Sequence, residues 1–265
     1  MALRGHYRDL RHVDPIDRNN RTFVPFRHGG STIASAIAPL HTIRFPGETD
    51  EYRAARNELL QAELELRRQN EAVAAQRRRL PLGGEVPTDY AFHESVRDAA
   101  RSVRLSELFA NGQDTLVLYS FMFIGDGLES ACPSCTSIID AVDGETPHMV
   151  QRVSLAAVAK VPIERFRDHA RTRGWRNIRL LSSADTTYNR DYHGEGPDES
   201  QDPIATVFVR RDGKVHHFYS TELLFAPTDP GVHPRHVDFM WPVWNVLDLT
   251  PAGRGTDWSP QLEYR

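Results

Sequence analysis

The sequence predicts an α/β sandwich, and three observations support this fold class. Apolar runs of strand length, separated by segments that predict helices, occur at residues 115–123, 154–159 and 178–183. Two further apolar runs, 204–209 and 215–219, flank Arg-Asp-Gly, a pattern typical of a hairpin turn. Strands that alternate with helices form βαβ units, so this order favours a sheet covered by helices.

A long amphipathic helix is expected before this domain. Thr49 is suited to be its N-cap, two acidic residues follow in the first turn, and Pro81 ends the pattern. An apolar stripe recurs at three- and four-residue steps, at Tyr52, Ala55, Leu59, Ala62, Leu66 and Val73. We expect the stripe to pack on the protein's own body. A homodimer seam is the alternative, although Gln69 and Gln76 interrupt its heptad.

The other elements follow in chain order. Short strands are expected at 90–92 and 103–105, before the strand at 115–123. Helices are expected at 135–142 and from Pro162 to about Gly174, because proline favours the first helical position. The apolar segment 239–249, with two tryptophans, is expected to cover the sheet. The expected domains are an extension at 1–40, the helix at 41–84, the α/β domain at 85–256 and a tail at 257–265.

Composition limits the classes of function. The 265 residues are 40% hydrophobic and 26% charged with a formal net charge of -4, which is ordinary for a globular protein and gives no sign of nucleic-acid binding. No apolar stretch approaches the roughly 20 residues that a membrane helix needs, and residues 1–8 lack the apolar core of a secretory signal. We therefore expect a cytoplasmic protein without membrane partners.

The two cysteines of the chain lie in one Cys-Pro-Ser-Cys motif, Cys132 to Cys135, just after the apolar run 115–123. A structural zinc site would need about four ligands, and no second pair of cysteines exists. The histidine pairs at 216–217 and 233/236 lack a clear carboxylate partner, so no metal is expected. No Walker loop, dinucleotide fingerprint or nucleophile elbow is present, so no cofactor is expected either.

The strand-to-helix setting gives the two cysteines different roles. With Cys132 at the N-cap and Pro133 at the first helical position, free backbone donors stabilise a Cys132 thiolate. Such settings lower a thiol pKa from about 8.5 to roughly 3.5–7.5, so Cys132 is the predicted nucleophile. Cys135, one turn on, is the predicted resolving thiol. The acids Asp126 and Glu129 would act against the thiolate if they lay close to it.

The alternatives without redox chemistry are a pair of inert thiols and a disulfide that staples the loop. A loop of three residues gains little stability from closure, which disfavours the staple. A peroxiredoxin-like thiol peroxidase would need Pro-x-x-x-Thr-x-x-Cys, and the corresponding positions before Cys132 are Gly125 and Glu129. A non-enzymatic, redox-responsive binding module that uses the long helix as a partner surface is a further alternative.

Several motifs together resemble a bacterial thioredoxin-like family of predicted dithiol-disulfide oxidoreductases with an uncharacterised physiological substrate. The resemblance runs from about His41 to Gly255. It is carried by Arg-Ala-Ala-Arg-Asn-Glu-Leu-Leu at 53–60, Val-Arg-Leu-Ser-Glu-Leu-Phe at 103–109, Tyr-Ser-Phe-Met-Phe at 119–123, the cysteine motif, Gly-Trp at 174–175, Ser-Ser at 182–183, Tyr-Asn-Arg-Asp-Tyr at 188–192 and Leu-Asp-Leu-Thr-Pro at 247–251. It implies a three-layer α/β/α sandwich with a central mixed sheet.

The resemblance also implies a substrate groove beside the cysteines. In thioredoxin-like folds a cis-proline at a strand start lies next to the Cys-x-x-Cys motif, and the neighbouring backbone pairs with the substrate. Pro203 matches that placement and is expected to be cis, so the groove is assigned to Pro133, Ser134, Asp202 and Pro203. The partners implied are a disulfide-containing protein or small thiol substrate and a cellular thiol reductant.

Overall fold

The computed structural model describes residues 40–264 except 97, 98, 126, 231 and 256. The chain divides between residues 80 and 81 into two compact units, which we describe separately. The expected extension at 1–40 lies outside the described residues apart from Leu40. Across the described chain, no helix is both long enough and apolar enough to cross a membrane.

The first unit is dominated by helix α1, Asp50–Arg78, which confirms the predicted long helix. Its N-cap is Thr49, whose hydroxyl accepts the Tyr52 N–H at 3.1 Å. Next to the cap, Arg53 forms an ion pair with Glu48 in which both side chains are only 8% exposed. The large apolar side chains of the stripe are exposed, at 50% for Tyr52, 53% for Leu59, 61% for Leu66 and 41% for Val73.

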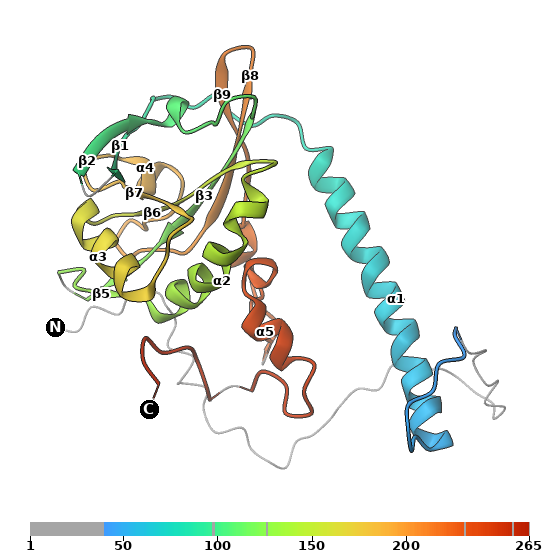
Figure 1. The fold of residues 1–265 in the computed structure, drawn as a ribbon. Helices are drawn as coiled ribbons and strands as arrows, with labels where there is room; N and C mark the ends of the chain where they lie inside the picture. Colours follow the sequence, from blue (N-terminus) through green and yellow to red (C-terminus); the bar gives the residue numbers. More distant parts are fainter. Residues whose placement is uncertain (1–39, 97–98, 126, 231, 256, 265) are drawn as a thin grey trace. The chain divides into compact units, whose positions relative to one another are not determined.

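The second unit is built on a mixed sheet of seven strands (Figure 1). The strands, from one edge to the other, are β2 (Ala99–Arg104), β1 (Ala91–Val96), β7 (Arg179–Ser182), β6 (Ser154–Ala159), β3 (Thr115–Phe121), β8 (Ala205–Arg211) and β9 (Lys214–Ser220). The three neighbours β7, β6 and β3 are parallel, and every other pairing is antiparallel. The chain is therefore a mixed α/β protein with a central mixed sheet, as the sequence predicts.

The two faces of the sheet are covered unequally. One face packs against α2 (Pro133–Met149), α3 (Ile163–Arg173) and α5 (Pro242–Leu247), in a core that includes Phe121, Ile139 and Trp241. The other face packs against the short helix α4 (Tyr188–Asp191) and the 3-10 turn η1 (Leu105–Glu107). The second helical layer is thus thin. Two further 3-10 turns, η2 (Glu222–Leu224) and η3 (Asp238–Met240), precede α5.

Helix α2 extends seven residues beyond the predicted end at Val142, through Gly144 and Pro147. A proline at 147 cannot donate to the carbonyl of Asp143, the bond that a regular helix would make there. The side-chain amide of Asn177 donates to that carbonyl instead, at 3.0 Å. Burial of this end of the helix and the replaced hydrogen bond explain why the helix continues where local propensity predicts a stop.

Helix α4 lies in the stretch 184–202, for which the sequence predicts no element. It is only four residues long, and its first residue, Tyr188, is fully buried. Tyr188 packs edge-on against Phe92 with the ring centroids 5.2 Å apart. The helix is therefore held by a tertiary contact, which a search for hydrophobic periodicity over longer windows does not detect.

Candidate redox site

The cysteine motif lies where β3 leads into α2. After β3 the chain forms a small antiparallel pair, β4 (Phe123–Ile124) with β5 (Ser130–Ala131), and this pair returns the chain to the start of the helix. The N–H of Cys132 donates to the carbonyl of Met122 at 3.1 Å. Cys132 is the N-cap of α2 and Pro133 is its first residue, as the sequence predicts.

The Cys132 sulfur receives hydrogen bonds from the first turn of the helix. Its Sγ accepts the Cys135 N–H at 3.4 Å. The pKa of the Cys132 thiol is lowered because the Cys135 thiol donates to it, against the effect of burial, and because the N–H groups of Cys135 and Ser134 also donate. The groups that favour the thiolate are therefore neutral donors at a helix N-terminus.

Cys135 has the opposite environment. Its side chain is fully buried, while Cys132 is 5% exposed. Burial above all, together with the neighbouring Cys132, raises the pKa of the Cys135 thiol well above its ordinary value. Both cysteines are free thiols in the structure. The pair therefore combines a sulfur suited to attack with a sulfur held protonated one turn away.

The loop before the motif is fastened by α3. The guanidinium of Arg165 donates to the carbonyls of Gly127 and Leu128 at 2.9 and 2.7 Å. The Glu129 carboxylate folds back within the loop and accepts the Gly127 N–H at 2.9 Å. The other acid that could oppose the thiolate, Asp126, lies outside the described residues.

Two side chains next to the motif contact neighbouring elements. Thr136 and His169 of α3 share a hydrogen bond of 3.0 Å between Oγ1 and Nε2. Burial, aided by the charge of Arg173, lowers the pKa of His169, so this imidazole is neutral at pH 7. The indole N–H of Trp241 donates to the Ser137 hydroxyl at 3.0 Å. These two contacts fix the orientation of the first turns of α2, and neither of them places a positive charge beside the cysteines.

Pro203 is buried, but the peptide bond before it is trans, because the described chain contains no cis peptide bond. The expectation of a cis-proline is therefore wrong. A trans-proline suits this place at the start of β8, where the strand does not need its N–H as a donor. The residues around Pro203 nevertheless lie beside the segment that leads to the cysteines. Ile204 accepts the Ser120 N–H at 2.8 Å, and the Gln201 side chain accepts the Phe123 N–H at 3.0 Å.

The groove residues assigned from the sequence lie in two segments, the first turn of α2 and the loop before β8. Pro133 and Ser134 form the first turn of α2. Asp202 lies on the loop before β8, where its N–H donates to the Gly194 carbonyl at 3.1 Å. Gln201 is a residue that the sequence did not single out, since a glutamine in a polar loop carries no motif.

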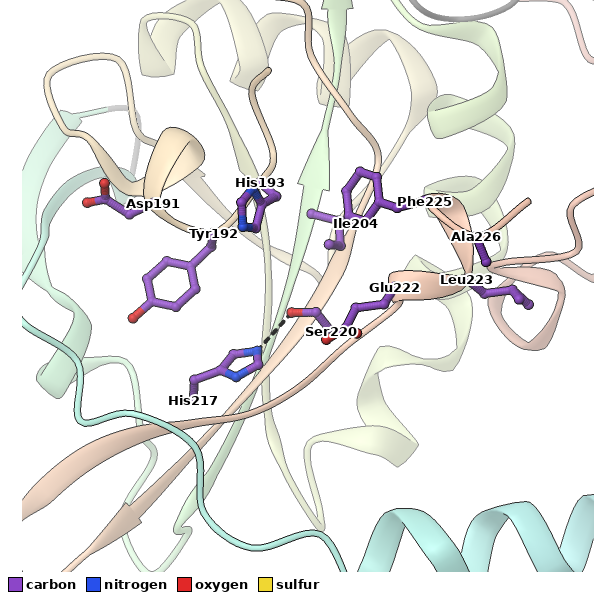
Figure 2. A pocket seen from close by; sticks show the side chains of 10 residues that line it. All are labelled: Asp191, Tyr192, His193, Ile204, His217, Ser220, Glu222, Leu223, Phe225 and Ala226. Carbon is purple, nitrogen blue, oxygen red and sulfur yellow. Dashed lines mark hydrogen bonds between the residues drawn. The ribbon is translucent and has the colours of Figure 1, made fainter. Parts of the chain in front are cut away.

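A hollow that the sequence did not predict lies between α4, η2, the start of β8 and the end of β9 (Figure 2). Its volume is about 850 Å³, and Tyr192, His193, Ser220 and Phe225 are among its lining residues. His217 Nε2 and Ser220 Oγ lie 2.9 Å apart in it. None of the residues that line the hollow is a cysteine.

The described residues contain no cluster of three or more histidine, cysteine or acidic side chains that could hold a metal ion.

Comparisons with known proteins match the chain to one protein family. A family model described as "Bacterial protein of unknown function (DUF899)" matches residues 43–265. No curated protein matches the chain. Among solved structures, AhpC of Enterococcus faecalis is 7% identical with a TM-score of 0.42, covering 63% of this chain and 93% of its own. Peroxidoxin BcpB of Mycobacterium tuberculosis is 17% identical with a TM-score of 0.38, covering 63% and 98%.

An uncharacterised conserved protein from Geobacillus kaustophilus is 16% identical with a TM-score of 0.38, and the match covers 58% of this chain and 75% of that protein. At such scores these likenesses say nothing about activity. We therefore infer the function from the residues of this chain.

Proposed function

The chain belongs to this family of bacterial proteins of unknown function, and we propose that it is a thiol-disulfide oxidoreductase with Cys132 as nucleophile and Cys135 as resolving thiol. The observation that carries the proposal is the asymmetry of the two thiols. Cys132 sits at a helix N-cap with a lowered pKa, and Cys135 is buried one turn away with a raised pKa. A thiol with a lowered pKa is the better nucleophile near neutral pH, and a protonated thiol one turn away can resolve the mixed disulfide.

The reaction proceeds by two exchanges. The Cys132 thiolate attacks one sulfur of a substrate disulfide, a protein–substrate bond forms, and the other substrate sulfur leaves as a thiolate that takes up a proton. Cys135 then loses its proton and attacks Cys132 Sγ, which forms the Cys132–Cys135 disulfide and releases the second substrate sulfur. The substrate is reduced to two thiols, the protein is oxidised, and a cellular thiol reductant restores the protein.

The segment 201–204 is proposed to border the substrate. Gln201 and Ile204 hydrogen-bond to the backbone of residues that lead from β3 into the cysteine loop. Together with Pro133 and Ser134 on the first turn of α2, this segment forms the groove in which a disulfide-containing chain or a small disulfide lies against Cys132.

Thiol titration tests the proposal. The variants are Cys132→Ser and Cys135→Ser, and serine at 135 keeps a hydroxyl donor near Cys132. In Cys135→Ser we expect the alkylation rate of Cys132 to rise with pH through a midpoint below the free-thiol value of about 8.5. We also expect this variant to retain glutathione as a mixed disulfide, detected by mass, while Cys132→Ser retains none.

Two outcomes reject the proposal. If Cys132 titrates like a free thiol and no variant traps glutathione, the thiols are inert and the motif belongs to a binding module. If the wild-type chain consumes hydrogen peroxide faster than it reduces insulin or glutathione disulfide, the chain is a peroxidase.

A further inference from the structure

A β-bulge in β9 brings two polar side chains together at the hollow drawn in Figure 2. The pairing of β8 with β9 changes register between Val207 and Phe208, which leaves Phe218 as an extra residue on β9. Residues three apart on a regular strand point to opposite faces of the sheet. The bulge removes that alternation, and His217 Nε2 lies 2.9 Å from Ser220 Oγ (Figure 2). Bulges that re-aim a side chain in this way are common next to functional sites.

The bulged part of β9 is fastened along its outer edge. The N–H of Gly83 donates to the His217 carbonyl at 2.9 Å, and the His217 N–H donates to the Gly84 carbonyl at 3.0 Å. A Cβ at residue 83 would lie 2.7 Å from that carbonyl oxygen of His217, so glycine is what permits this close approach. The ring of Tyr192 stacks on the His217 ring with the centroids 6.0 Å apart. The imidazole is therefore held in place from two sides.

The hydrogen bonds of Ser220 leave it an acceptor towards the hollow. Its hydroxyl donates its one proton to the buried Thr206 Oγ1 at 3.2 Å, so in the contact with His217 the imidazole is the donor, through Nε2–H. Burial lowers the pKa of His217, against the effect of the Glu222 charge, so the ring is neutral at pH 7. A hydroxyl oxygen has two lone pairs. One lone pair of Ser220 therefore stays available to a ligand that donates.

The charges around the hollow favour a positively charged ligand. Asp191 and Glu222 border it with carboxylates, and none of the described residues that line it is a lysine or an arginine. Asp191 also accepts the hydroxyl protons of Tyr90 and Thr187, at 2.7 and 2.6 Å. An ionised carboxylate can only accept hydrogen bonds. An anion in the hollow would thus meet negative charge with no compensating cation, whereas a cation would be attracted.

The remaining walls of the hollow are largely apolar. Ile204 is buried, while Leu223 and Phe225 are 54% and 51% exposed. His193 has a φ of 56°, in the left-handed region that residues other than glycine seldom adopt, and its ring lies edge-on to Phe225 with the centroids 6.1 Å apart. Aromatic faces attract organic cations. The volume of about 850 Å³ is in the range of small-molecule sites.

We propose that this hollow is a binding site for a small organic amine in its ammonium form. The ammonium group donates to Ser220 Oγ and to the Glu222 carboxylate, and the apolar body of the ligand packs against Leu223 and Phe225. The site is separate from the cysteine motif, because Tyr192 packs with the core cluster on the face of the sheet opposite the cysteines. The inference therefore goes beyond the proposed thiol exchange and does not depend on it.

Two probes of opposite charge test the proposal. Phenethylamine and phenylpropionate share a phenyl ring and a two-carbon chain, and at pH 7 the first is a cation and the second an anion. Each probe is titrated into the reduced full chain, and binding is followed by saturation-transfer NMR of the probe. We expect phenethylamine to bind with a Kd on the order of 1 mM or tighter, and phenylpropionate to bind at least about tenfold more weakly.

Phe225→Ala and Phe239→Ala form a matched pair of variants. Both phenylalanines are exposed, at 51% and 63%, so neither truncation should unfold the chain, and of the two only Phe225 lines the hollow. We expect Phe225→Ala to weaken phenethylamine binding by about fivefold or more, because the ring of the probe loses its apolar partner. With Phe239→Ala the affinity should stay within about twofold of wild type.

Ser220→Ala and Glu222→Gln separate the two polar contacts of the amine. Ser220→Ala should weaken phenethylamine binding by about fivefold, the effect of one lost hydrogen bond, and leave phenylpropionate binding unchanged. Glu222→Gln should narrow the difference in affinity between the two probes, because the neutral amide neither attracts the amine nor repels the acid. Circular dichroism checks that each variant is folded.

Three outcomes overturn the inference. Equal affinity for phenethylamine and phenylpropionate means that the hollow does not select a cation. Equal weakening by Phe225→Ala and Phe239→Ala means that the probe binds elsewhere on the chain. A lack of saturable phenethylamine binding at millimolar concentration means that the hollow is no amine site. None of these measurements involves Cys132 or Cys135, so failure here is distinct from failure of the thiol exchange.

Discussion

Helices α1 and α2 both carry apolar side chains at helical spacing, yet they are stabilised differently. In α2 seven side chains are buried, among them Cys135, Ile139 and Asp143. In α1 the one buried residue is Arg53, and the large apolar side chains of the stripe are between 41% and 61% exposed. Each helix is compared within its own unit, where tertiary packing holds α2, and the cap, the length and local side-chain pairs hold α1.

The difference shows which helix can hold a reactive side chain in a fixed position. A nucleophile must be held within a fraction of an ångström, and that requires a rigid supporting shell. Packing of α2 into the core fixes the axis on which Cys132 and Cys135 sit. Pairs on α1 such as Arg68 with Glu65 join exposed side chains and are worth only tenths of a kcal/mol in such settings.

The largest effect that would sharpen this comparison is expected from Ile139→Ala in α2. Ile139 is fully buried, so its truncation leaves a cavity and should lower the free energy of unfolding by about 2 to 5 kcal/mol. Urea denaturation of the reduced protein, followed by tryptophan fluorescence, measures this value. All four tryptophans lie between residues 175 and 258, so the signal reports the second unit alone.

A loss below about 1 kcal/mol for Ile139→Ala would contradict the comparison, because a tightly packed site cannot lose a branched side chain at so small a cost. It would mean that α2 is not held by the core as described.

Much of this fold is predictable because periodicity and local signals agree there. Strand β6 begins and ends where the apolar run predicts, and α1 begins at Asp50, directly after its predicted N-cap Thr49. The end of α2 was not predictable, because Asn177 replaces a helical hydrogen bond from a distant part of the chain. The trans bond before Pro203 was missed since the expectation came from a resemblance and not from local chemistry.

The site was predictable in part for the same reason. The positions of Cys132 as N-cap and Pro133 as first helical residue follow from local preferences, and the structure places both residues there. Gln201 was not singled out. It stands in a polar loop, and only the position of that loop beside the end of β3 brings its side chain to the Phe123 N–H. Polar groups that act through tertiary contacts leave no spacing signal.

A smaller effect is expected from Asp143→Asn, which tests the other end of α2. One carboxylate accepts the backbone N–H groups of Arg176, Asn177 and Ile178 at 2.8 to 3.1 Å and so joins α2 to the start of β7. The neutral amide of asparagine has one oxygen and cannot accept all three N–H groups as the carboxylate does. We therefore expect the free energy of unfolding to fall by about 1 to 2 kcal/mol.

Glu145→Gln is the matched control for Asp143→Asn, because it makes the same chemical change on an exposed side chain of the same helix. Its free energy of unfolding should stay within about 0.5 kcal/mol of wild type. If both variants lose the same amount, the effect comes from helix charge and not from the join to β7.

The smallest effect is expected from Leu66→Ala in α1, and this prediction can break the comparison. Leu66 is 61% exposed, so truncation removes little buried surface, and alanine is itself a strong helix former. The free energy of unfolding, followed by far-ultraviolet circular dichroism at two protein concentrations, should change by less than about 0.5 kcal/mol. A loss of unfolding free energy above about 1 kcal/mol for Leu66→Ala would mean that the stripe is covered in solution. If that loss depends on protein concentration, a second copy of the chain covers the stripe, since dissociation links stability to mass action. If it does not, the cover is the chain's own body, and α1 would then be held by packing as α2 is.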